Sequence, residues 1–158
     1  MKKFFLLLSL ISIFNPAIAC SFVPGYEPLR VTSAYQSNFV PDKPYALISS
    51  VRRGFDDGNG GSCSDAGILT IKIDDSNPTH KTAYKFKVLD NELFSSIFPS
   101  EPVMISPLEI KTGEMFFVWF DLGETKGKKM NFTLEIVAVA PSGTESEPFE
   151  LAVNEASR

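Results

Sequence analysis

The chain has 158 residues, of which 44% are hydrophobic and 22% charged, a balance typical of one globular domain and not of a disordered chain. It carries 15 Lys and Arg against 19 Asp and Glu, a formal net charge of −4. A protein that binds nucleic acid through phosphate contacts needs a basic surface, and this composition offers none overall. We therefore expect no nucleic-acid partner.

Residues 1–19 have the pattern of a secretory signal peptide. Lys2 and Lys3 precede an apolar run, residues 4–14, and Ala17-Ile18-Ala19 is the small-x-small pattern that signal peptidase reads. The apolar run is shorter than the roughly 20 residues of a membrane-spanning helix, and we expect no transmembrane segment. The prediction is export, to the periplasm, cell surface or extracellular space of a bacterium. Removal of the two lysines leaves 13 basic and 19 acidic side chains, a formal charge of −6.

Cys20 and Cys63 are the only cysteines. Export would place them in an oxidising compartment, which favours a disulfide between them. That bond would close a loop of about 44 residues and stabilise the fold by roughly 3–4 kcal/mol in the chain-entropy model. The alternative is a lipid anchor at Cys20, because residues 17–20 resemble the lipobox of bacterial lipoproteins. Both alternatives stay open at this point.

The remaining chain divides into three parts. Residues 20–44 contain four prolines, which predicts an extended lead-in tethered to the domain, with one short strand at 29–34. Residues 45–154 hold the strand patterns of the domain, and residues 155–158 form a tail.

Alternating apolar and polar residues predict most of the strands. We expect them at Tyr45–Val51, Gly67–Ile73, Ala83–Val88, Val103–Ile110, Met115–Phe120, Asn131–Ala140 and around Phe149–Val153.

Three of the expected elements have special features. Val103–Ile110 is interrupted by Pro107, which favours an edge strand. Met115–Phe120 is apolar without alternation, as in a strand buried on both faces, and residues 121–129 would be its hairpin loop. Asn91–Phe98 favours a short helical turn capped by Asn91. Seven to eight strands with polar turns predict an all-β fold, an antiparallel β-sandwich.

The last two strands add a resemblance. Phe132–Val139 followed by Ser142–Pro148 resembles the end of a fibronectin type III domain, a member of the immunoglobulin-like sandwiches. Phe132 stands where that family has a Tyr, so its hydroxyl-to-backbone bond is absent, and Trp119 comes later than the family's core Trp. The resemblance implies the fold and says little about activity, because this fold carries many functions.

The sequence holds few residues that suggest catalysis. His80, the one histidine, lies in a polar turn, and we expect it to be exposed. Asp57-Gly58-Asn59 begins like a calcium loop, but the twelfth position is Ile68, which cannot ligate. We expect no metal, no cofactor and no enzyme. A small hydrolase is the alternative, and its carboxylates would come from Asp56, Asp57, Asp74, Asp75 or Asp121.

The function we expect is that of an exported binding or interaction module. Its partner would be a protein or a surface polymer, bound through sandwich loops or a sheet edge. A further alternative rests on a resemblance: the mature terminus, residues 20–24, is similar to that of tissue metalloproteinase inhibitors, in which a disulfide-bonded N-terminal Cys reaches a protease zinc.

Overall fold

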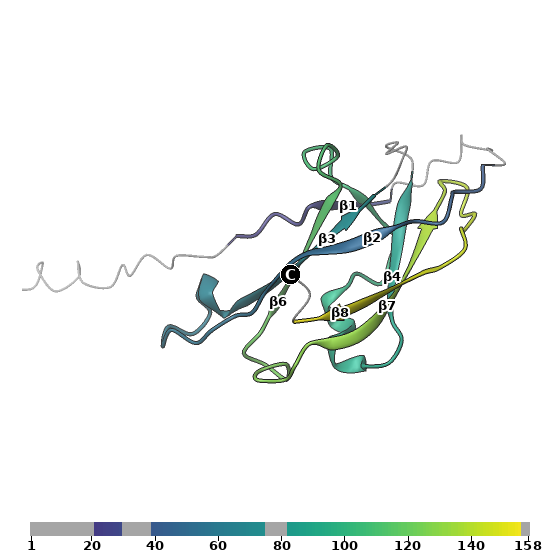
Figure 1. Ribbon diagram of the computed structural model, residues 1–158. Helices are drawn as coiled ribbons and strands as arrows, with labels where there is room; N and C mark the ends of the chain where they lie inside the picture. The colour runs from purple at the N-terminus through teal and green to yellow at the C-terminus, as the bar shows by residue number, and fades with distance from the viewer. Residues whose placement is uncertain (1–20, 30–38, 75–81, 156–158) are drawn as a thin grey trace, which may run out of the picture.

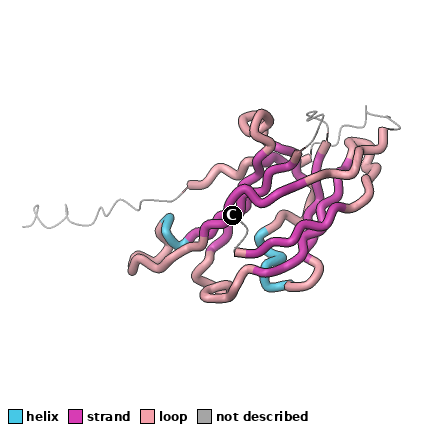
Figure 2. Tube along the Cα trace, in the orientation of Figure 1, coloured by secondary structure: helices cyan, strands magenta, loops and turns pink. Residues whose placement is uncertain are grey.

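The computed structural model describes residues 21–29, 39–74 and 82–155, and strands dominate them (Figures 1 and 2). The strands are β1 (Tyr26–Pro28), β2 (Ala46–Arg52), β3 (Ala66–Ile73), β4 (Ala83–Val88), β5 (Val103–Ile105), β6 (Glu114–Phe120), β7 (Asn131–Val139) and β8 (Phe149–Asn154). Two short 3-10 helices complete this part of the chain, η1 (Cys63–Asp65) and η2 (Glu92–Ile97). None of its helices is long and apolar enough to cross a membrane.

The strands form two antiparallel sheets. One has five strands in the order β1-β5-β4-β7-β8, and the other has three in the order β2-β3-β6. Every pairing within them is antiparallel. The prediction of an all-β fold built from antiparallel sheets is confirmed.

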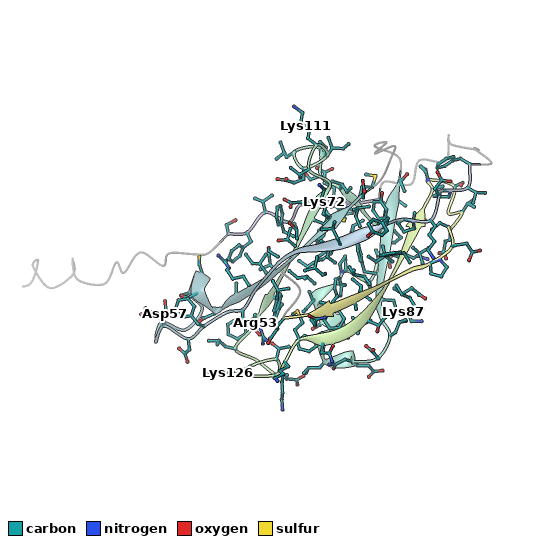
Figure 3. All side chains as sticks on the ribbon, in the orientation of Figure 1. Arg53, Asp57, Lys72, Lys87, Lys111 and Lys126 are labelled. Atoms are coloured by element: carbon teal, nitrogen blue, oxygen red, sulfur yellow. The ribbon has the colours of Figure 1, made fainter. Side chains whose placement is uncertain are left out.

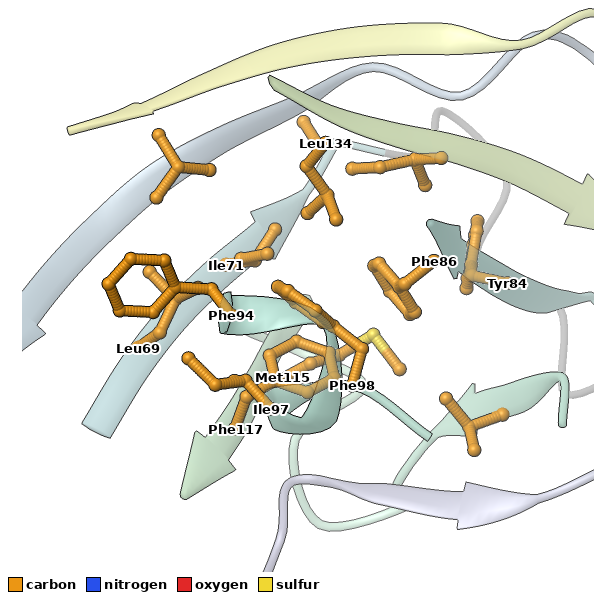
Figure 4. Close-up of a cluster of buried hydrophobic side chains, with 14 of the residues drawn as sticks. Leu69, Ile71, Tyr84, Phe86, Phe94, Ile97, Phe98, Met115, Phe117 and Leu134 are labelled. Carbon is orange, nitrogen blue, oxygen red and sulfur yellow. The ribbon is translucent and has the colours of Figure 1, made fainter. Parts of the chain in front are cut away.

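The core lies between the two sheets and is rich in phenylalanine (Figure 4). Phe117 of β6 is fully buried, and its ring lies 4.9 Å from the ring of Phe86 on β4 and 4.9 Å from that of Phe98. Leu69 and Ile71 of β3 belong to the same cluster. Rings at these separations add roughly 0.5–1.5 kcal/mol per pair beyond the burial of their area. The aromatic residues therefore join the sheets as well as fill the space between them.

The helical turn expected at residues 91–98 is present as η2. Phe94 and Ile97 are buried, and η2 contacts β4 and β6, so it closes one side of the core. The predicted cap is wrong, however, because the Asn91 side chain accepts no hydrogen bond from the helix. Its amide donates to the Asn131 carbonyl at 3.3 Å instead and so links η2 to β7.

The predictions for β6 were wrong in two respects. Only its inner residues, Met115, Phe117 and Trp119, are buried, whereas Phe120 is 60% exposed, so only one face packs on the core. Because β6 and β7 lie in different sheets, residues 121–129 connect the two sheets and do not form a hairpin loop. Glu114–Phe120 is one of the two edge strands of the smaller sheet, and its outer apolar residues hid that from the sequence pattern.

The prediction for residues 103–110 was also partly wrong. The strand ends at Ile105, before Pro107, and it is not an edge, because β1 pairs with it on the side away from β4. β1 itself was not expected from the sequence, since it spans three residues in a proline-rich segment. Most of the strand expected at 29–34 lies outside the described residues.

Gly67 and Trp119 depend on one another. They face each other across β3 and β6, and a Cβ at Gly67 would lie 2.2 Å from the indole ring. The ring is held there by a hydrogen bond of 3.0 Å from Trp119 Nε1 to Asp121 Oδ1. The Trp119 ring thus occupies the space that a side chain at position 67 would need.

We predict that Gly67→Ala lowers the free energy of unfolding by about 1–3 kcal/mol, because the added methyl forces the Trp119 ring to move. Gly60→Ala is the matched control, since a Cβ there meets nothing within 4 Å, and it should change stability by less than about 0.5 kcal/mol. Urea unfolding measures both variants. Equal stability of the two would contradict the packing described for Trp119.

Candidate functional site

Three charged residues meet at one end of the sandwich, and each directly follows a strand. Arg53 follows β2, Asp121 follows β6 and Glu155 follows β8. β2 and β6 are the two edges of the smaller sheet, and β8 is an edge of the larger one. The cluster therefore joins the ends of three strands from both sheets.

Arg53 uses all of its hydrogen-bond donors within the protein. Nε and Nη2 donate to the two oxygens of Asp121 at 2.6 and 2.7 Å. Nη2 also donates to the Thr125 carbonyl at 2.9 Å, and Nη1 donates to the Lys128 carbonyl and to Glu155. A guanidinium has five N–H donors, so none remains for a ligand. Arg53 therefore acts within the fold, and binding of a ligand anion is not its role in this arrangement.

Asp121 is the centre of this cluster, and its residue is only 2% exposed. Besides the two bonds from Arg53, its carboxylate accepts from the Trp119 indole, the Gly54 backbone N–H at 2.8 Å and the Thr125 hydroxyl at 3.0 Å. We call these residues the Arg53 clamp: Arg53, Gly54, Trp119, Asp121, Thr125 and Glu155. A buried ion pair is tolerated when its remaining lone pairs are also satisfied, as they are here.

The clamp sets the charge state of its members. Burial alone would raise the pKa of Asp121, but the hydrogen bonds from Arg53, Trp119, Gly54 and Thr125 outweigh it and hold the pKa below its usual value. The hydrogen bond to Asp121 raises the pKa of Arg53. Both groups are therefore charged at neutral pH.

A pocket of about 300 Å³ lies beside the clamp. Arg53 and Lys126, two of the residues that line it, are labelled in Figure 3. Its lining includes the exposed residues Phe55, Lys126, Lys128 and Lys129 as well as Asp56. Lys126 Nζ lies 3.5 Å from a carboxylate oxygen of Asp56, so these two loops carry opposite charges across the opening. The residues come from the β2–β3 connection, 53–65, and from the β6–β7 connection, 121–130.

The β2–β3 connection is ordered by its own hydrogen bonds. Asp57 accepts from the hydroxyls of Ser62 and Ser64 at 3.1 and 2.6 Å, and from the backbone N–H of Asn59 at 2.9 Å. These bonds lower the pKa of Asp57. Ser62 also caps η1 through a hydrogen bond from the Ser64 backbone N–H. η1 is a single turn at the end of this loop.

The carboxylates predicted for a hydrolase do not gather in one place. Asp56, Asp57 and Asp121 lie at the clamp end and are held by the contacts above, whereas Asp74 follows β3 at its opposite end, eight residues away along the strand. Asp75 and His80 lie outside the described residues. The hydrolase hypothesis thus has no converging pair of free carboxylates among the residues the structure places.

The glycine-rich loop shows no metal-binding arrangement either. Over residues 21–29, 39–74 and 82–155, no three His, Cys, Asp or Glu side chains come close enough to hold a metal ion. Cys63 is exposed on η1, and Cys20 lies outside the described residues, so their pairing stays a prediction.

Sequence reasoning missed Arg53 and Glu155 altogether. A charged residue directly after a strand was visible in each case, but which strand ends meet depends on the sheet order, which the sequence pattern does not give.

Comparisons with known proteins add no relative. No family model matches the chain, and neither the curated proteins nor the solved structures compared with it include a match.

We predict that Arg53→Met lowers the free energy of unfolding by about 3 kcal/mol, because it leaves the buried Asp121 carboxylate without its partner charge. Since a quarter of the Arg53 side chain is exposed, the loss should lie at the lower end of the range for buried pairs. Arg52→Met removes the same charge from an exposed neighbour and is the control. Urea denaturation of both variants tests the clamp, and similar midpoints for the two would argue against it.

The clamp also predicts an acid limit to stability. The folded pKa of Asp121 is lower than its unfolded value of about 3.9, so the stabilisation is present above about pH 4 and is lost as pH falls through the folded pKa. Asp121→Asn should be less stable at pH 7 and should lose less stability between about pH 4 and pH 2 than the natural chain. Exposed Glu147→Gln is the control for loss of one charge. Parallel pH profiles for natural chain and Asp121→Asn would contradict the assignment.

Proposed function

We propose that this protein is an exported binding module with an immunoglobulin-like sandwich, and that it contacts its partner through the loops around the Arg53 clamp. The observation that carries the proposal is the pocket beside the clamp. Phe55 and three lysines are exposed there, next to an ion pair whose hydrogen-bonding groups are all paired.

The strand order supports the finer fold assignment. Of the seven strands β2–β8, the first, second and fifth form one sheet, and the fourth, third, sixth and seventh form the other in that order. Immunoglobulin-like sandwiches, including fibronectin type III domains, use Greek-key connections of this kind between two antiparallel sheets. β1 would be an addition beside β5.

The chemistry of the loops favours a protein partner. Phe55 is 65% exposed, and an exposed aromatic side chain is the kind of anchor that interfaces bury. Lys126, Lys128 and Lys129 line the same pocket as Phe55 and bring positive charge to it, on a chain whose net charge is negative. An acidic protein surface with an apolar recess fits this combination, since the lysines attract it and Phe55 fills the recess.

The Arg53 clamp holds the loops in place before a partner binds, so the loops lose little conformational freedom on binding. Both loops have backbone atoms held by Arg53 or Asp121, namely those of Gly54 in one loop and of Thr125 and Lys128 in the other. Binding costs less when the contact surface is already in place. Loops on a rigid sandwich are also the usual place for recognition in such folds.

No observation favours the two alternatives to the same degree. The hydrolase hypothesis lacks converging carboxylates in the described part of the chain. The inhibitor hypothesis depends on Cys20, which lies outside it. Export itself continues to rest on the signal-peptide pattern of residues 1–19.

We expect a photo-crosslinking amino acid at position 55 to capture an acidic protein in intact cells. The same substitution at Leu108, which is 83% exposed in the β5–β6 connection, is the control and should capture little. Charge reversal of the three loop lysines, Lys126→Glu, Lys128→Glu and Lys129→Glu, should abolish the adduct from position 55. The proposal fails if positions 55 and 108 give the same adducts, if the charge reversal changes nothing, or if the captured material is a polysaccharide.

A further inference from the structure

One edge of β6 offers backbone hydrogen-bonding groups that no described residue uses. The ladder with β3 is flanked by two hydrogen bonds: Ile73 N–H donates to the Gly113 carbonyl at 2.9 Å, and Asp121 N–H donates to the Asp65 carbonyl at 2.9 Å. Hydrogen-bonded pairs alternate along an antiparallel ladder, so the even-numbered residues of β6 direct their N–H and C=O groups away from β3. Three of them meet no other backbone group in the described part of the chain: Phe116, Val118 and Phe120.

This edge lacks the features that keep strand edges from pairing with another chain, which are short length, proline, bulges and charged side chains. The other three edges of the described sheets each have one. β1 is three residues long and ends in Pro28, and β8 carries Glu150. β2 has a register shift between Ile48 and Ser50. β6 pairs with β3 in unbroken register, and its one charged residue, Glu114, is the first. Its free edge is therefore open to a further strand.

The free part of the edge is bounded at both ends. Gly25 lies beside its start, where a Cβ would be 2.9 Å from the Glu114 carbonyl oxygen, and the Gly25 carbonyl accepts from Ser106 N–H at 2.9 Å. At the other end, the Asp121 side chain is buried in the Arg53 clamp, so the chain turns inward there. A second strand can therefore pair with residues 116–120 and not beyond them.

Those residues are nearly symmetric about their centre. They read Phe-Phe-Val-Trp-Phe, with two aromatic residues on each side of Val118. A two-fold axis through Val118 would place Phe116 opposite Phe120 of a second copy, and Val118 opposite its own counterpart. Residues that pair in this way have their side chains on the same face of the sheet, here the outer face, where Phe120 is 60% exposed. Residues 116–120 include no charged side chain, so no like charges would meet.

We propose that β6 pairs antiparallel with β6 of a second copy, centred on Val118, so that the two smaller sheets become one continuous sheet across a two-fold axis. Such an isologous contact is self-complementary, and its main-chain hydrogen bonds use the groups that each copy leaves unpaired. Phe116 and Phe120 of opposite copies cover one another. An interface of a few residues a side is much smaller than the standard of about 20–30, so the dimer dissociates on dilution. This contact uses β6 and not the pocket loops, so it does not depend on the proposed function.

Amide hydrogen exchange of the natural chain, followed by NMR at several protein concentrations, tests the pairing without any variant. The Val118 and Phe120 amides should exchange at least about tenfold more slowly at high concentration than at low, because they are hydrogen-bonded only in the dimer. The Phe117 and Trp119 amides, which donate to β3 within one copy, should be protected at every concentration.

Sedimentation velocity over the same concentrations should show the change from monomer to dimer. A monomer throughout overturns the proposal. So does exchange at Val118 and Phe120 that is independent of concentration, whether these amides are fast throughout or protected within one molecule.

A charge swap tests the register. Val118→Lys should raise the dissociation constant of the dimer at least about tenfold, because the two lysines would lie directly opposite one another. Val118→Glu should do the same, whereas an equimolar mixture of the two variants should restore the dimer, because residue 118 meets its own counterpart on the axis. Leu47→Lys, at an exposed position of β2 in the same sheet, is the control and should leave the dimer unchanged. A mixture that stays monomeric, or an equal effect of Leu47→Lys, refutes the pairing centred on Val118.

The charge reversal of the three loop lysines separates the two proposals. Lys126→Glu, Lys128→Glu and Lys129→Glu together should abolish the adduct from position 55 and leave the dimer unchanged, whereas Val118→Lys should weaken the dimer and leave that adduct in place. A dimer that is lost on reversal of the lysines would place the contact on the pocket loops and refute the pairing of β6.

Discussion

The ion pair between Arg53 and Asp121 is the constraint on which this end of the molecule depends. A carboxylate that is 2% exposed is tolerated only if its charge is compensated and its lone pairs are used, and Asp121 achieves this with five donors. Those donors come from the end of β2, from β6 and from the loop that follows it. The same guanidinium reaches Glu155 after β8. β2, β6 and β8 are edge strands, so no backbone hydrogen bonds between strands connect them to one another. The clamp connects the ends of these three strands through side chains.

This arrangement explains how the protein keeps a polar surface of defined shape without a long helix or a metal site in the described residues. The hydrophobic core ends at Trp119, whose ring is packed over Gly67 and whose N–H already belongs to the clamp. From that point outward the chain is organised by hydrogen bonds, first around Asp121 and then around Asp57 in the β2–β3 connection. The side chains of Phe55, Lys128 and Lys129 take no part in either network and are exposed, which leaves them available for contacts with another molecule.

The sequence predicted those strands in which one face is buried and the other is exposed to solvent. Residues 84–87 of β4 and 131–136 of β7 alternate, and the inner residues of these stretches are the buried ones. β6 was misread because Phe116, Val118 and Phe120 are apolar on the outer face, so the pattern no longer marked which face is buried. The clamp was beyond prediction for a different reason. Arg53 and Glu155 are 102 residues apart, and only the sheet order brings the ends of their strands together.

Asp65 and Asp121 are two buried acids joined by a backbone hydrogen bond, which the Asp121 N–H donates to the Asp65 carbonyl. One has every lone pair occupied by groups of the folded domain, and the other lacks a partner for one oxygen. The Asp65 carboxylate accepts from the backbone N–H groups of Gly61 and Ser62 and so completes the capping box of η1, which an apolar residue would not do. The two acids thus order the same end of the molecule, Asp121 where β2 and β6 end and Asp65 where the β2–β3 connection leads into β3.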